Sequence, residues 1–197
     1  GTPGRDLFQL TSSGVTMAGL GGMTFNGFET LSGSGGNDVF VISDGSGFGG
    51  VLDGGTGIDV VDFSKSVANR TLTLTKSSTN GFSGREQLLG GSFLAVESVI
   101  GGSGSDTLIG LNVPARWDLA GKQYKDMTSS AAKILKWKAF ENFVGGSKAD
   151  TFVGASGSIP LSLTGGAGND FLDASAVLSS VTLVGGDGAD TLKSGRG

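Results

Sequence analysis

The sequence predicts an all-β chain that winds as a right-handed parallel β-helix or β-roll solenoid, with about 20 residues per coil and its glycine–aspartate turns stacked on one edge. Three observations lead to this prediction. Glycine supplies 38 of the 197 residues, far above its usual share of about 7%. A nine-residue pattern of glycine and aspartate recurs along the chain. Its copies follow one another at intervals close to about 20 residues or to twice that number.

The nine-residue pattern begins at a glycine in six places. The copies are GSGGNDVFV from Gly33, GGTGIDVVD from Gly54, GGSGSDTLI from Gly101, GGSKADTFV from Gly145, GGAGNDFLD from Gly165 and GGDGADTLK from Gly185. The sixth position is always aspartate: Asp38, Asp59, Asp106, Asp150, Asp170 and Asp190. The eighth is always apolar: Phe40, Val61, Leu108, Phe152, Leu172 and Leu192. Short apolar segments between glycine turns cannot bury themselves alone, but stacked coils form a continuous core.

The spacing of the copies sets the predicted length of a coil. Gly33 and Gly54 are 21 residues apart, and the last three copies follow at intervals of 20. The gaps of 47 residues before Gly101 and 44 after it are each about two coils. A degenerate copy, GKQYKD from Gly121, places Asp126 in the aspartate slot of one such coil.

Several short apolar segments between the turns are predicted to be strands. They are Val39–Ile42, Val60–Phe63, Thr71–Thr75, Thr151–Val153 and Val181–Val184. The one helix-like segment, Ser130–Lys138, is expected to be strand or turn, because it aligns with Gly19–Met23 in an earlier part of the chain.

A longer duplication lies over the short repeat. FNGFETLSGSGGND from Phe25 aligns with WKAFENFVGGSKAD from Trp137, and RDLFQL from Arg5 aligns with RWDLAG from Arg116. We therefore expect a single continuous solenoid over residues 1–197, made of two related modules of about 1–111 and 112–197, the second shortened. The chain stops at Gly197 just after a repeat, which predicts a fragment of a larger protein.

Composition excludes several classes of function. Cysteine and histidine are absent, so disulfides and thiolate or imidazole metal sites are excluded. The net charge of −4 gives nucleic-acid binding no electrostatic support. No apolar run approaches the ~18 residues of a membrane span. Hydrophobic residues make up 37% of the chain, too many for a disordered glycine–serine tail.

The aspartate column predicts a bound cation. Equivalent residues in stacked coils lie about 4.8 Å apart. Two carboxylates at this distance repel by roughly 1 kcal/mol in water and about 3 kcal/mol at an effective dielectric of 20. A cation between them turns this repulsion into attraction. Because only carboxylate and carbonyl oxygens are on offer, calcium fits better than octahedral magnesium. The glycines allow the positive φ that turns carbonyl groups inward.

The pattern resembles the hemolysin-type calcium-binding repeat of RTX proteins, GGxGxDxUx with U apolar. The copies from Gly54, Gly101, Gly165 and Gly185 match it fully, whereas Ser34 and Lys148 replace a glycine in the other two. The longer module resembles repeats of very large secreted or surface adhesin-like bacterial proteins.

The resemblance implies that two successive turns share each ion. One turn supplies the carbonyls of positions one and three and its aspartate, and the next supplies those of positions two and four and its aspartate. One ion would lie among Gly33, Gly35, Asp38, Gly55, Gly57 and Asp59. A second would lie among Gly145, Ser147, Asp150, Gly166, Gly168 and Asp170. A third would lie among Gly165, Ala167, Asp170, Gly186, Gly188 and Asp190. Asp106 lacks a full neighbour and is the weakest metal site predicted.

These features predict a calcium-binding structural module of a secreted or cell-surface bacterial protein that folds on calcium outside the cell, rather than an enzyme. Its partners would be calcium ions and neighbouring domains of the same long chain, with a surface glycan or protein receptor reached through the parent protein. The alternatives are a polysaccharide-active parallel β-helix enzyme and a carbohydrate-binding module. The aromatic residues Trp117, Trp137, Phe25 and Phe140 could stack on sugars, although core packing is the better interpretation.

Overall fold

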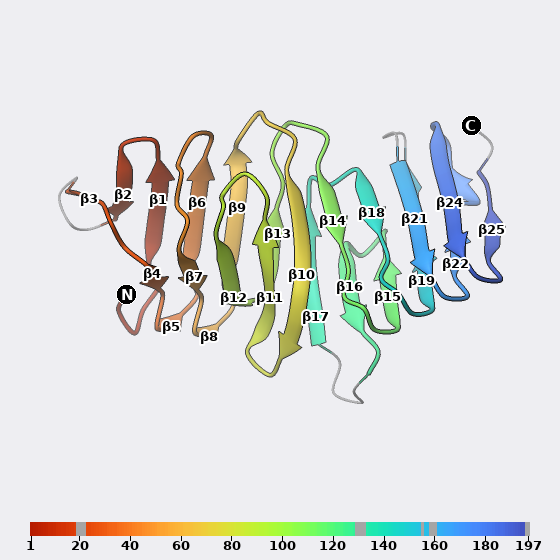
Figure 1. The fold of residues 1–197 in the computed structure, drawn as a ribbon, viewed down its shortest axis with the longest axis horizontal. Coiled ribbons are helices and arrows are strands. Elements are labelled where there is room, and N and C mark those ends of the chain that lie inside the picture. Colours follow the sequence, from red (N-terminus) through yellow and green to blue (C-terminus); the bar gives the residue numbers. More distant parts are fainter. Residues whose placement is uncertain (19–22, 129–132, 155, 158–160, 196–197) are drawn as a thin grey trace.

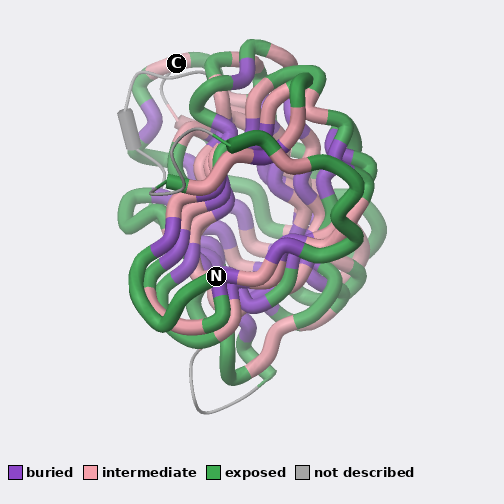
Figure 2. The backbone as a smooth tube through the Cα atoms, turned by 90° about the vertical axis from the view of Figure 1, so that its left-hand side faces the viewer, coloured by how far each residue is buried: buried purple, intermediate pink, exposed green. Residues whose placement is uncertain are grey.

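The computed structural model describes residues 1–18, 23–128, 133–154, 156–157 and 161–195, and its regular structure within these ranges is entirely β-strand. The chain passes back and forth between two large sheets whose strands follow one another along the long axis of the molecule (Figure 1). Viewed from the N-terminal end, the successive passes overlie one another around a shared interior (Figure 2).

The bounds of the strands follow the order in which they pair. The 12-stranded sheet contains β25 (Thr191–Lys193), β22 (Phe171–Asp173), β19 (Asp150–Val153), β15 (Ala115–Asp118), β16 (Gln123–Asp126), β17 (Lys133–Lys138), β13 (Ser98–Ile100), β9 (Val60–Lys65), β6 (Val39–Ser43), β1 (Leu7–Thr11), β2 (Gly14–Met17) and β3 (Thr24–Phe25). The 9-stranded sheet contains β24 (Val181–Asp187), β21 (Leu161–Ala167), β18 (Asn142–Val144), β14 (Thr107–Ile109), β10 (Thr71–Ser78), β11 (Gly81–Glu86), β12 (Ser92–Val96), β7 (Val51–Asp53) and β4 (Thr30–Ser32). Two small pairs complete the set: β5 (Gly35–Gly36) with β8 (Thr56–Gly57), and β20 (Ser156–Gly157) with β23 (Ala176–Val177).

Strands from successive repeats pair in parallel, as the spacing predicts. In the 12-stranded sheet Val39 pairs with Val60, a step of 21 residues. Thr151 pairs with Phe171, and Phe171 pairs with Thr191, each a step of 20 residues. All five predicted strands are present. The helix-like segment is also a strand where it is described, because β17 covers Lys133–Lys138; its residues 130–132 lie outside the described residues.

The apolar repeat positions form the core. Phe40, Val61, Leu108, Phe152 and Leu172 are all 0% exposed. Leu192, at the same position in the last strand of the 12-stranded sheet, is 45% exposed because no further described strand covers it. Trp117, Trp137 and Phe140 are buried in this core, so the core-packing interpretation is confirmed for these three. The fourth aromatic residue, Phe25, is only half-buried and lies outside the core.

The predicted parallel winding is interrupted by antiparallel strands. β10, β11 and β12 form an antiparallel meander within the 9-stranded sheet, and β15, β16 and β17 form another within the 12-stranded sheet. The prediction that each wide gap holds two ordinary coils is therefore wrong. Asp126 does not occupy an aspartate slot, because it lies on antiparallel β16, where its carboxylate binds Ser77 and Thr128.

The meander in the 9-stranded sheet takes up the length of half a coil, so the next repeat turn follows after one and a half coils and lies on the opposite edge. We call first edge the side where the chain leaves the 9-stranded sheet for the 12-stranded sheet, and second edge the opposite side. Five repeat turns lie on the first edge. The Gly101 turn joins β13 to β14 and lies on the second edge, so the prediction of a single edge is wrong for this copy. The Gly101 turn was expected on the first edge. The short turn from Ala95 to Glu97 occupies that place instead.

Candidate metal sites

Buried aspartates at the first edge form a hydrogen-bonded ladder. The backbone N–H of Asp38 donates to Oδ1 of Asp59 at 2.8 Å, and the N–H of Asp150 donates to Oδ1 of Asp170 at 2.7 Å. The ladder continues from Asp170 to Asp190 at 2.9 Å. Since each aspartate immediately precedes or begins a strand of the 12-stranded sheet, parallel pairing aligns their carboxyl groups in a column.

The repeat turns adopt two backbone conformations. Four turns have positive φ at positions two and four, and we call them open turns. They begin at Gly33, Gly54, Gly165 and Gly185. The values are 75° and 111° for Ser34 and Gly36, 93° and 140° for Gly55 and Gly57, 106° and 126° for Gly166 and Gly168, and 107° and 134° for Gly186 and Gly188. Closed turns, those from Gly101 and Gly145, lack positive φ at these positions. In both, the second glycine donates its N–H to the aspartate of its own turn instead.

The turns at the first edge leave carboxylate oxygens without a partner. Oδ2 of Asp38, Asp59 and Asp170 is buried and has no hydrogen-bond partner among the described residues, and the same holds for Oδ1 of Asp150. An unsatisfied buried carboxylate oxygen is costly. In contrast, both oxygens of Asp106 accept backbone N–H groups, from Arg70 at 2.7 Å and from Gly102 at 2.6 Å. Unpartnered oxygen therefore concentrates at the first edge.

Carbonyl oxygens surround the same gaps between turns. A Cβ on Gly57 would overlap with the Gly36 oxygen, and a Cβ on Gly188 would overlap with the Gly168 oxygen. In the opposite direction, a Cβ on Gly33 would stand 2.7 Å from the Gly54 oxygen. The earlier turn therefore directs its carbonyls of positions two and four at the later turn, which directs its position-one carbonyl back.

These carbonyl directions differ from the ligand order that the resemblance implied, and which carbonyls bind an ion stays a prediction. The implied sets take positions one and three from the earlier turn, but the Gly33 oxygen faces the preceding turn, where a Cβ on Gly1 would overlap with it. The backbone carbonyl of Asp187, at position three of a later turn, accepts the N–H of Gly168 in the earlier turn at 2.8 Å. The two aspartates of each predicted set lie next to each other along the ladder.

The first position of each turn must be glycine for a steric reason. A Cβ there would stand within 2.7 Å of a carboxylate oxygen of the aspartate five residues later, in all six copies. Such an approach is closer than real Cβ atoms tolerate, so any other residue would displace the carboxylate. Glycine at position one thus positions the aspartate, whereas glycine at positions two and four supplies the positive φ.

Sequence reasoning missed two kinds of ladder residue. The segment GTPGRDLFQ from Gly1 forms a seventh turn, in which buried Asp6 donates its N–H to Asp38 at 2.7 Å. Its Gly1, Asp6 and Phe8 fall in the repeat slots, a signal that was present in the sequence. Glu97 also takes an aspartate's place, because its Oε2 accepts the N–H of Asp59 at 2.6 Å. Its longer side chain reaches the column from a turn shortened to three residues.

On the second edge, Asp106 belongs to a separate structural cluster. Its own N–H donates to Glu141 Oε2 at 2.9 Å. The neighbouring Arg70 is 3% exposed and forms ion pairs with Asp44 at 2.6 Å and Glu86 at 3.2 Å. Backbone amide groups thus satisfy both carboxylate oxygens of Asp106, which leaves this carboxylate no free oxygen for a cation.

Burial raises the pKa of the ladder carboxyl groups. Burial, followed by the charge of Asp170, raises the pKa of Asp150 from 3.8 to about 7. Burial also raises the pKa of Asp38, Asp59 and Asp170, in each case with a further contribution from a neighbouring acidic residue. Without a cation the column is therefore an unfavourable place for negative charge.

Calcium binding is expected to weaken as the pH falls from 7 to 5. The pKa of Asp150 is raised in the folded state, so without metal its proton stabilises the fold fully below pH 3.8, and this contribution is lost as the pH rises through about 7. Calcium must displace that proton. Calorimetric titrations at pH 6.5 in buffers of different ionisation enthalpy should therefore show proton release. Asp150→Asn should reduce the release, and an unchanged release in this variant would contradict the assignment.

The acidic side chains do not gather into larger clusters. Across the described ranges, no three Asp or Glu side chains come together as a metal-binding group. Each turn contributes one aspartate to the ladder, so carbonyl oxygens would have to complete any coordination shell. Calcium accepts such mixed oxygen shells of six to eight ligands. The donor set at the open turns therefore fits this ion.

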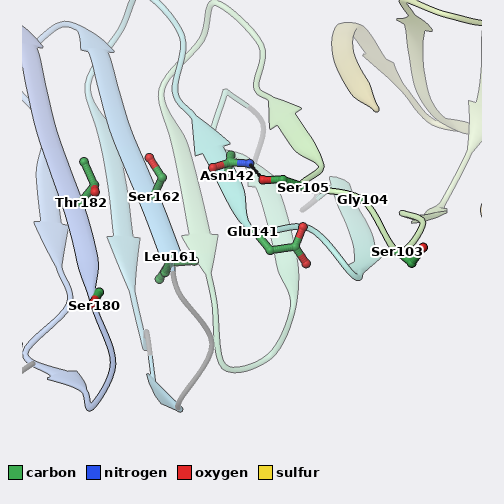
Figure 3. A pocket seen from close by; sticks show the side chains of 9 residues that line it. All are labelled: Ser103, Gly104, Ser105, Glu141, Asn142, Leu161, Ser162, Ser180 and Thr182. Atoms are coloured by element: carbon green, nitrogen blue, oxygen red, sulfur yellow. Dashed lines mark hydrogen bonds between the residues drawn. The ribbon is translucent and has the colours of Figure 1, made fainter. Parts of the chain in front are cut away.

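An open groove of about 600 Å³ crosses the outside of the 9-stranded sheet near the second edge (Figure 3). It is lined by Ser103, Gly104, Ser105, Glu141, Asn142, Leu161, Ser162, Ser180 and Thr182. Glu141 is the one charged residue of this lining and already accepts the N–H of Asp106. The Asn142 amide donates to the Ser105 hydroxyl at 3.0 Å. The groove thus offers no pair of carboxylates for acid–base chemistry.

Comparison with known protein families matches four segments of the chain to the RTX calcium-binding nonapeptide repeat: residues 23–41, 96–112, 162–176 and 180–197. They contain the turns from Gly33, Gly101, Gly165 and Gly185. No curated protein matches the chain at a significant level. None of the described segments is a helix long and apolar enough to cross a membrane. The chain therefore carries repeats of the RTX calcium-binding nonapeptide family, and repeats of this family bind calcium.

Proposed function

We propose that the chain is a calcium-dependent structural module whose open turns hold the ions at the first edge. The observation that carries this proposal is the set of buried, unpartnered carboxylate oxygens on Asp38, Asp59 and Asp170. A cation would satisfy these oxygens and cancel the repulsion along the column.

Two gaps between turns have the best ligand sets. The Gly33 and Gly54 turns are both open and pair through β5 and β8. The Gly165 and Gly185 turns are also both open and pair through β21 and β24. The ions would bind the two aspartates of each pair, carbonyls of positions two and four of the earlier turn, and carbonyls of positions one and three of the later turn. The gap between Asp150 and Asp170 has one closed turn and would bind more weakly.

The module would act in the parent protein as a stiff spacer. Alternation between two sheets, with steps of 20 and 21 residues, supports the predicted solenoid. RTX repeats are typically found in secreted bacterial proteins. We propose that this chain is likewise exported and folds when it meets calcium outside the cell, where it presents a neighbouring domain. Three of the four sugar-stacking candidates, Trp117, Trp137 and Phe140, are buried, and Phe25 is half-buried, so the alternatives of a polysaccharide-active enzyme and a carbohydrate-binding module gain little support.

Equilibrium dialysis against calcium is expected to give two ions bound per chain in a stronger class and a third in a weaker class. Affinities in the range of extracellular calcium modules, about 10⁻⁴–10⁻³ M or tighter, are expected for such sites. Magnesium should not compete at equal concentration, because it requires a near-ideal octahedral shell. Fewer than two ions bound, or equal binding of magnesium, would contradict the proposal.

A further inference from the structure

The N-terminal end of the molecule leaves both sheets with an unpaired outer strand. β3 ends the 12-stranded sheet and β4 ends the 9-stranded sheet among the described strands (Figure 1). Between them lies an apolar cavity of about 260 Å³, lined mainly by Phe8, Val15, Met17, Phe25, Phe28 and Leu31. Phe28 is 43% exposed at its mouth. Two open sheet edges and an apolar cavity therefore meet on one face.

The same arrangement recurs in the interior, where it is covered. β1 and β6 pair through Phe8 and Phe40, just as β15 and β19 pair through Trp117 and Phe152. Phe8 thus corresponds to Trp117 in the structure. This correspondence is shifted by two residues from the sequence alignment that pairs Arg5 with Arg116. By the same scheme β3 corresponds to β17 and β4 to β18.

The interior counterparts are covered by two strands. β13 pairs in parallel with β17, setting Val99 beside Trp137. β14 pairs in parallel with β18, setting Leu108 beside Phe143. The strand pair β13–β14 thus extends both sheets at once, and no described strand has that role at the N-terminal face.

A three-residue motif shows what the open face lacks. Gly27-Phe28-Glu29 corresponds to Ala139-Phe140-Glu141, and the first residue of each has positive φ, 76° and 55°. Phe140 is only 5% exposed under the covering strands, whereas Phe28 is 43% exposed. Glu141 accepts the N–H of Asp106, which precedes β14, but Glu29 is exposed.

The backbone at Gly1 follows the same correspondence. The N–H of Gly110, directly after β14, donates to the Val144 carbonyl at 2.8 Å. The amino group of Gly1 donates to the equivalent Ser32 carbonyl at 2.5 Å. Gly1 therefore occupies the place that Gly110 holds in the interior, so a strand like β14 can be joined to it in the correct register.

We propose that the N-terminal face is a docking surface for a preceding module of the same kind in the same polypeptide, whose last two strands resemble β13 and β14. A valine in the place of Val99 would cover Phe25, and a leucine in the place of Leu108 would cover Leu31. An aspartate in the place of Asp106 would donate its N–H to Glu29. The inference goes beyond the proposed calcium function and does not rest on it, since the contacts are strand pairing and apolar packing.

A tandem protein tests this surface: residues 1–109 joined directly to Gly1 of the full chain, studied at saturating calcium. Hydrogen exchange of the amides in 24–32 of the full chain is expected to slow by about tenfold or more relative to the single chain. A matched tandem protein with Val99→Asp and Leu108→Asp in the added copy should lose this protection. Equal exchange in the tandem protein and the single chain would overturn the proposal.

A pair of alanine variants gives a second measurement. Phe140→Ala should lower the urea midpoint of both the single chain and the tandem protein, because Phe140 is buried in both. Phe28→Ala should leave the urea midpoint of the single chain unchanged. The same substitution in the full-chain copy of the tandem protein should lower the midpoint. An unchanged urea midpoint for Phe28→Ala in the tandem protein would overturn the proposal. Dimers of the single chain that dissociate in the Phe28→Ala variant would also overturn it, because the occupant would then be a second copy.

Discussion

Removing calcium with EGTA is expected to lower the melting temperature of the chain by roughly 10–20 °C and to reduce its far-UV β-sheet signal. Each ion bound at a hundredfold excess over its Kd, which is about 10 mM calcium for a Kd of about 10⁻⁴ M, stabilises the folded state by about 2.7 kcal/mol. Two ions therefore contribute about 5 kcal/mol, and each kcal/mol shifts the melting temperature of a chain of this size by about 2–4 °C. The loss is large because four buried carboxylates at the first edge leave an oxygen unpartnered without the metal.

Circular dichroism across a calcium titration measures this effect. Added calcium should restore the spectrum and the melting temperature after chelation, whereas equimolar magnesium should not. Because repeat arrays can lose cooperativity, the open-turn regions around Asp38–Asp59 and Asp170–Asp190 should lose hydrogen-exchange protection before the meanders do. An unchanged melting temperature in EGTA would contradict both the ligand assignment and the proposed function.

Periodicity predicted the parallel strands and the core, but it could not predict the meanders. A gap of two coils and a gap of one and a half coils with an added hairpin have nearly the same length. Local turn chemistry could have separated them: Asn80-Gly81 is a strong hairpin signal, and the structure places Gly81 at φ 98° at the start of β11, paired with Ser78 of β10. The meander enters and leaves its sheet at the same edges as a single strand would. Only one and a half coils therefore separate the Gly54 turn from the Gly101 turn, which explains why Asp106 left the predicted column.

The aspartates of the candidate sites were predictable, but the conformation of each turn was not. The turns from Gly54 and Gly101 both match the nine-residue pattern, yet the first is open and the second closed. Ser34 adopts φ 75° although it is not glycine, so residue identity alone does not decide. The preceding turn does: each open turn lies against a repeat turn that precedes it in the stack, whereas the closed turns lie against irregular segments, Gly102 against Ser66 and Gly146 against Leu111.

Asp170→Asn and Asp106→Asn are expected to respond to calcium in opposite ways. Asp170 lies between two turns, accepts one N–H and keeps a buried oxygen unpartnered. In EGTA, Asp170→Asn removes a buried charge whose pKa burial has raised, so the variant should be as stable as the parent or more so. In calcium it should lose roughly 2.7 kcal/mol, which is one ion at hundredfold excess.

Asp106→Asn is the matched control because it makes the same chemical change in the same sequence pattern. Both oxygens of Asp106 accept backbone N–H groups, and an asparagine can accept only one of them. The variant should therefore lose about 1–3 kcal/mol through the unsatisfied donor, with or without calcium. Urea unfolding of both variants in calcium and in EGTA separates the two roles. The loss in Asp170→Asn should appear only with calcium, and the loss in Asp106→Asn should not depend on it. Equal calcium dependence in the two variants would show that the ions do not distinguish open turns from closed ones.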